Sequence, residues 1–105
     1  MIQVEDVKKY LRIPYEDDDD FIAAAIESGY DYLRDAVDYC DELLASNERF
    51  ARKADMWVLT QYCPDAYDKR EGGTGAAPEL GYAARAMLMQ LQLYTYDAGG
   101  GEKNE

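Results

Sequence analysis

The sequence contains no histidine. This absence removes the side chain that most often serves as a general base and as a transition-metal ligand. The glycine-rich stretch GGTG, which begins at Gly72, shows neither of the glycine spacings that cradle phosphates after a strand. Pairs of acidic residues are plentiful, as in any acidic chain, so they do not single out a catalytic site. We therefore expect no enzyme, no cofactor and no metal site; an enzyme would need a magnesium-binding carboxylate cluster.

Long apolar runs and paired cysteines are also missing. No run approaches the roughly 20 residues that cross a membrane, and the N-terminal MIQVEDVKK has no apolar signal segment. The two cysteines, Cys40 and Cys63, stand far apart, which favours buried free thiols in a reducing compartment over a disulfide or a reactive thiol. We expect a soluble protein that is made in the cytoplasm and has no membrane partner.

Positive charge is scarce. The chain has 11 Lys and Arg against 22 Asp and Glu, a net charge of −11, so it lacks the basic footprint of a nucleic-acid or anionic-membrane binder. Residues 1–45 hold 13 acids and 4 bases, whereas residues 46–105 hold 9 acids and 7 bases. The two parts should present different electrostatic faces, and nearby DNA would be repelled rather than bound.

What the chain does contain is helical periodicity. Its 105 residues suffice for one modest core, and apolar positions recur at intervals of three and four. The predicted fold class is all-α, a small bundle of about four helices in one domain over residues 1–97, with a disordered tail at 98–105. A short first helix covers residues 4–13, a long second one runs from the acid run to residue 44, and a third covers residues 47–62 or beyond. A C-terminal helix begins at residue 78, after a flexible Gly-rich loop.

Two prolines and a polar pair set the expected helix ends. Pro14 stops the first helix because the residue before a proline avoids helical angles. Pro64 should kink or end the third helix because it has no N–H to donate to Thr60. Ser46 or Asn47 can cap the start of that helix. The predicted core comes from the apolar stripes of the second and third helices: Ile22, Ile26, Leu33, Trp57 and Val58.

The stretch YEDDDDF, residues 15–21, holds five consecutive acids. A helix start carries partial positive charge and unpaired N–H groups, which predicts that the aspartates form the cap and first turn of the second helix. One cap needs only one or two acids, so the surplus is either a solvated edge or a surface that meets a basic partner. A calcium loop is the alternative, although the stretch lacks the central Gly and terminal Glu of an EF-hand. The residues concerned are Asp17, Asp18, Asp19 and Asp20.

The last helix is apolar on two faces. One stripe contains Leu80, Met87 and Leu91. A helix with two apolar faces is either central in its own domain or sandwiched between its domain and a partner. The ten tyrosines leave the same choice open between core and interface. The second stripe, offset by about 200° around the axis, holds the candidate oligomer interface: Tyr82, Met89, Leu93 and Tyr96.

Several of these features occur in a familiar order. A short helix ending in YLRI leads into the acid run and a long amphipathic helix, over residues 4–33. The aromatic and aliphatic run MWVL follows at residues 56–59, and YDKRE follows at residues 67–71. Over roughly residues 2–95 the chain resembles the head–tail connector, or head-completion adaptor, proteins of long-tailed phages and prophages. The positions that carry this resemblance are Tyr10, Leu11, Arg12, Ile13, Tyr67, Arg70 and Glu71.

The resemblance implies a structural protein without enzymatic activity. Such a subunit would form a ring of about a dozen copies beneath the phage portal protein. The ring would extend the DNA channel, let DNA pass without specific binding, and offer a docking surface to neck or tail completion proteins. The protein would lie in the virion neck, and in the host cytoplasm before assembly. The alternative is a small acidic inhibitor or DNA mimic that binds a basic partner. A mimic should spread its acids over an elongated face, whereas here they gather at one helix start and along one helix.

Overall fold

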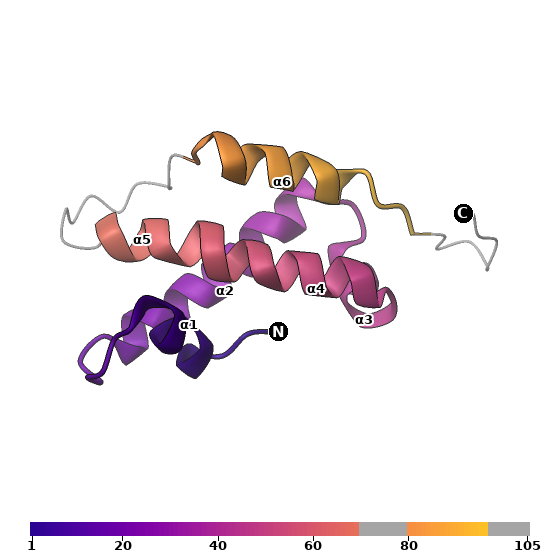
Figure 1. Ribbon diagram of the computed structural model, residues 1–105. Coiled ribbons are helices and arrows are strands. Elements are labelled where there is room, and N and C mark those ends of the chain that lie inside the picture. Colours follow the sequence, from indigo (N-terminus) through magenta and orange to yellow (C-terminus); the bar gives the residue numbers. More distant parts are fainter. Residues whose placement is uncertain (70–79, 97–105) are drawn as a thin grey trace.

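The computed structural model describes residues 1–69 and 80–96, and every regular element within these two segments is a helix. The all-α class is therefore confirmed. A long helical rod is formed by α4 (Glu48–Trp57), the π-helical segment η1 (Val58–Tyr62) and α5 (Cys63–Lys69). Figure 1 shows α2 (Asp19–Ala36) crossing behind this rod and α6 (Tyr82–Gln92) lying along it. The predicted Gly-rich loop and the tail at 98–105 lie outside the described residues.

The first helix, α1 (Val4–Leu11), ends before the proline that was expected to stop it. Arg12 adopts a left-handed backbone conformation with φ 61°. Its N–H donates to the Lys9 oxygen at 3.3 Å, and the Ile13 N–H donates to the Lys8 oxygen at 2.9 Å. These bonds satisfy carbonyl groups of the last turn, as a left-handed C-cap does. The YLRI motif is thus the end of α1 and its cap.

The second predicted helix is in fact two helices. α2 ends at Ala36, Val37 is extended, and α3 (Cys40–Ser46) begins after a turn whose Tyr39 has φ 57°. The side chain of Gln92 in α6 donates to the Ala36 oxygen at 3.1 Å, which satisfies a carbonyl at the end of α2. The prediction of one helix to residue 44 was wrong, because contacts from distant segments hold this corner and the apolar period continues across it.

Pro64 does not end the third predicted helix. The π-helical segment η1 ends two residues before it, and the Cys63 N–H donates to the oxygen of Val58, five residues back. A proline inside a regular α-helix removes one hydrogen bond and crowds the carbonyl four residues earlier. A π-helical turn changes the bonding register there, so the rod continues through Lys69. Asn47 is confirmed as the cap of α4, since its Oδ1 accepts the Phe50 N–H at 3.0 Å.

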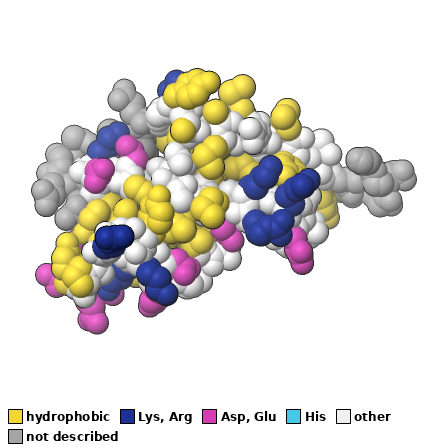
Figure 2. All heavy atoms as spheres, viewed as in Figure 1, with side chains coloured by type: hydrophobic (Ala, Val, Ile, Leu, Met, Phe, Trp, Pro, Cys, Tyr) yellow, Lys and Arg dark blue, Asp and Glu magenta, His cyan; other side chains and the backbone are white. Residues whose placement is uncertain are grey.

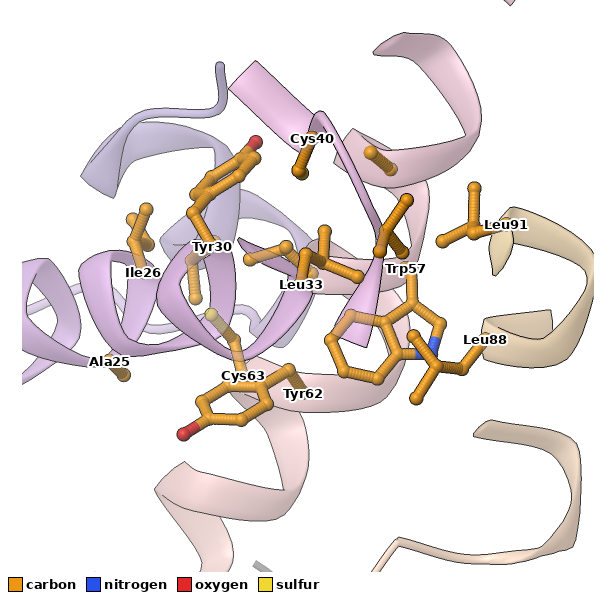
Figure 3. Close-up of a cluster of buried hydrophobic side chains, with 14 of the residues drawn as sticks. Ala25, Ile26, Tyr30, Leu33, Cys40, Trp57, Tyr62, Cys63, Leu88 and Leu91 are labelled. Carbon is orange, nitrogen blue, oxygen red and sulfur yellow. The ribbon is translucent and has the colours of Figure 1, made fainter. Parts of the chain in front are cut away.

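The core lies where α2 crosses the rod and α6 covers it. Figure 3 shows the indole of Trp57 between Leu33 of α2 and Leu88 of α6. α2 approaches η1 closely at Gly29, where a Cβ atom would lie 3.0 Å from Val58 Cγ1. The five residues predicted for the core all belong to this cluster: Ile22, Ile26, Leu33, Trp57 and Val58.

Candidate functional site

The outer face of α6 carries large apolar side chains that nothing in the described chain covers. Tyr82 is 82%, Leu93 80% and Met89 64% exposed. The opposite side of the same helix is buried through Ala84, Leu88 and Leu91. Figure 2 shows apolar side chains standing out along the edge that α6 forms. We call Tyr82, Met89 and Leu93 the α6 outer face.

Tyr96, the fourth residue of the predicted interface, lies elsewhere. α6 ends at Gln92, so the residues beyond Leu93 no longer follow the helical period. Tyr96 packs against the core, and its ring centroid lies 5.6 Å from that of Tyr39. The structure therefore separates Tyr96 from the α6 outer face.

The four aspartates of the acid run have different surroundings. Asp18 occupies the N-cap position of α2, but its carboxylate does not bind the helix N–H groups. It accepts a hydrogen bond from the Tyr67 hydroxyl at 2.6 Å instead. Asp19 lies in the first turn and pairs with Lys8 at 2.8 Å, a contact that raises the pKa of Lys8. Asp17 and Asp20 are exposed. The helix dipole still favours acids here, yet the predicted side-chain cap is not formed.

Tyr67 links this acidic turn to the rod. Besides its bond to Asp18, its hydroxyl lies 3.2 Å from the hydroxyl of Tyr15. Its ring also packs near Phe21, with the centroids 6.4 Å apart. Residues 15–21 comprise the turn before α2 and the first three residues of that helix; we call them the acidic loop, and contacts from α5 and α1 hold them. The neighbouring family-motif residues Arg70 and Glu71 lie outside the described part of the chain.

A partly buried hydrogen-bonded group joins α2, α4 and the residues that precede α1. The Tyr30 hydroxyl donates to Asp55 Oδ1 at 2.5 Å and accepts the N–H of Ile2 at 3.0 Å. Burial, followed by the hydrogen bond to Asp55, raises the pKa of Tyr30 above that of an ordinary tyrosine. This group was missed from the sequence, because no local spacing connects the three residues.

An open groove of about 580 Å³ lies between α1 and α4. Its apolar lining comes from Ile2, Tyr10, Met56 and Leu59, and its charged lining from Asp6, Lys9, Arg52 and Asp55. Tyr10 and Met56 are each 51% exposed. Figure 2 shows apolar side chains over this region and a group of Lys and Arg side chains on the adjacent part of α4. We call it the α1–α4 groove.

The basic group beside this groove consists of Arg49, Arg52 and Lys53. Among the described residues, none of the three pairs with a carboxylate. Lys53 instead lies 5.7 Å from the centroid of the Tyr94 ring. The sequence reasoning noted the overall acidity and did not find this local patch. The spacing of 49, 52 and 53 on one side of a helix was the available signal.

The described residues hold neither a metal-binding cluster nor an exposed thiol. Within residues 1–69 and 80–96, no group of three or more side chains could hold a metal ion. Both cysteines are free and buried, and burial raises the pKa of each thiol to about 11. In the same two segments, no helix is both long and apolar enough to span a membrane.

Comparison with known proteins places the chain in a family. No curated protein and no solved structure matches it significantly. A family model described as phage gp6-like head–tail connector protein matches residues 1–72. The match covers α1 to α5, and so includes the YLRI helix end, the acidic loop and the rod. It extends over more than half of the 105 residues. The chain therefore belongs to the phage gp6-like head–tail connector family.

Proposed function

We propose that the protein is a structural subunit that assembles as a ring of about a dozen copies between the phage portal protein and the neck or tail completion proteins. The ring extends the DNA channel, and the protein moves from the host cytoplasm into the virion neck on assembly. The family supports the connector role, and residues 1–97 act as its single domain. Because the net charge is −11, such a channel wall repels DNA phosphates and lets the DNA pass without specific binding.

The observation that carries the proposal is the α6 outer face. A monomer that works alone rarely leaves a large apolar patch in water, and such patches mark interaction sites. α6 is anchored on its inner side by Ala84 and Leu91, which are buried. Tyr82, Met89 and Leu93 are therefore presented on a fixed helix, ready to be covered by another subunit. A closed ring needs two different surfaces on each subunit, and the α1–α4 groove with its basic patch supplies a second one.

Native mass spectrometry over a wide concentration range, with negative-stain images of any large species, tests this proposal. The expected result is one discrete ring. A monomer at every concentration up to millimolar would contradict ring assembly. That result would favour the acidic inhibitor or DNA mimic, which needs no symmetric assembly.

A further inference from the structure

We propose that the α1–α4 groove binds the acidic loop, residues 15–21, of the next copy of this chain. The inference rests on the proposed function, because it names the contact between neighbouring ring subunits. The geometry of one chain carries it: the groove and the loop are complementary in charge and in apolar character.

The groove lining is balanced in charge, and the bases beside it make the surrounding surface positive. Its two acids each accept a hydrogen bond, Asp55 from Tyr30 and Asp6 Oδ2 from the Gln3 N–H at 2.8 Å, and both keep their negative charge. Lys9 and Arg52 line the same groove, and neither forms an ion pair within the described segments. Arg49 and Lys53 lie beside the groove and form no ion pair within the described segments, so they supply the excess positive charge that favours an acidic partner.

The acidic loop offers the matching features. Glu16, Asp17 and Asp20 are exposed and form no salt bridge among the described residues, although Glu16 lies near enough to Lys8 to contribute to its raised pKa. The exposed rings of Tyr15 and Phe21 stand at the two ends of the loop. Apolar side chains that flank acids fit a groove whose exposed Tyr10 and Met56 are bordered by bases. Apolar contacts and charge pairs would then form together across one interface.

The loop is already held in place before it binds. The Tyr67 hydroxyl bonds to Asp18 and Lys8 pairs with Asp19, so two of the acids fix the loop from within. A preformed loop loses little conformational entropy on docking. This accounts for the surplus of acids: two position the loop, and the others are free for the neighbour.

A chain cannot place this loop in its own groove. Lys8 points from α1 toward the loop, whereas Asp6 and Tyr10 on the same helix line the groove. With about 100° of rotation per residue, Lys8 and Tyr10 point in directions about 160° apart. α1 therefore separates the two surfaces. A loop on one side and a receptor on the other make a head-to-tail contact, the kind that closes into a ring.

Disulfide trapping tests the contact directly. Asp17→Cys and Met56→Cys are made in separate full-length chains, mixed and mildly oxidised. The expected product is a cross-linked pair that contains one chain of each kind, and a chain with both changes should give a ladder of higher species. Cys40 and Cys63 should form no cross-links because they are buried. The matched control is Glu27→Cys, an exposed acid on α2, mixed with Met56→Cys.

Charge-reversal variants provide an independent test of the contact between the groove and the acidic loop. Arg52→Glu should weaken self-association about tenfold, and Asp17→Lys in the same chain should restore much of it. Each variant is first checked for an unchanged melting temperature. Rings that form while the 17–56 pair cross-links no more than the 27–56 control would overturn this inference and leave the proposed function standing. If neither rings nor cross-links form, both this inference and the proposed function are rejected.

Discussion

The indole Nε1 of Trp57 donates a hydrogen bond to the backbone oxygen of Ala84 at 2.9 Å, between residues 27 positions apart. Trp57 is completely buried, so its N–H must find a partner inside the protein. That partner belongs to α6, and the bond fixes where α6 lies on the rod. The orientation of the α6 outer face is thus set by a core residue of α4.

Trp57→Ala should destabilise the protein by about 3–5 kcal/mol, because it removes a large buried ring and leaves a cavity. Trp57→Phe keeps part of the volume and loses the bond to Ala84, so the loss should be smaller, about 1–3 kcal/mol. Urea unfolding followed by circular dichroism measures both. An unchanged unfolding midpoint in the alanine variant would show that the indole does not support the core.

Gly29→Ala should lower stability although alanine is the better helix former. Alanine gains up to about 1 kcal/mol in helix propensity. Its Cβ would meet Val58 Cγ1 at 3.0 Å and Tyr62 Cδ1 at 3.1 Å, and overpacking of this kind costs about 1–3 kcal/mol.

A double-variant cycle isolates the cause of this loss. Val58→Ala removes one of the two clashing groups, so the free-energy losses of Gly29→Ala and Val58→Ala should sum to more than the loss in the double variant. Strictly additive losses in thermal unfolding would mean that the close approach of α2 and η1 is not the reason.

Periodicity along the sequence predicted the helical class and positions such as Ile22 and Trp57, because helical burial repeats locally every three or four residues. It could not predict the corner after Ala36. There the apolar stripe continues from Leu33 to Cys40, while Gln92 of α6 holds the end of α2. The break depends on a residue more than fifty positions away, which no local pattern contains.

Part of the candidate site could be predicted from the sequence. Two stripes offset on one helix placed Tyr82 and Met89 on the outer side of α6, since both lie inside the helix. Tyr96 was grouped with them only because the helix was extended past its end. The α1–α4 groove combines Tyr10 with Met56, and such a surface exists only after two separate helices pack.

Tyr67→Phe should loosen the acidic loop with little effect on global stability. The change removes the hydroxyl that bonds to Asp18 and approaches Tyr15, at a cost of about 0.5–1.5 kcal/mol. Amide hydrogen exchange in residues 15–18 should become faster than in α2. Tyr82→Phe, which alters an exposed tyrosine on α6, serves as the control and should leave the loop unchanged. Equal exchange in both variants would show that Tyr67 does not brace the loop.

Stability should fall as the pH rises above about 9. Burial raises the pKa of Cys40 and Cys63 from 9.0 to about 11. Below pH 9 the thiols are neutral in both states, and their contribution to stability is complete. Between about 9 and 11 the unfolded chain loses protons first, which favours unfolding. Urea midpoints should decline over this window, less steeply when both residues are changed to Ala. The raised pKa of Tyr30 adds a decline in the same direction that begins near pH 10.0, the ordinary tyrosine value, and continues above it. If the urea midpoint declines equally steeply in the variant that lacks both thiols, Cys40 and Cys63 do not cause the decline.

Met89→Glu combined with Leu93→Glu should abolish assembly and leave the monomer folded. Both side chains are mostly exposed, so charges there cost the monomer little, whereas a charge buried in an interface without a partner is strongly unfavourable. Ala23→Glu with Ala45→Glu adds the same charge at two exposed positions on α2 and α3 and should leave assembly unchanged. Native mass spectrometry measures the oligomeric state, and circular dichroism measures the helix content. If the α6 pair loses helical signal, the face belongs to the core; if rings persist in that pair, another surface holds the subunits together.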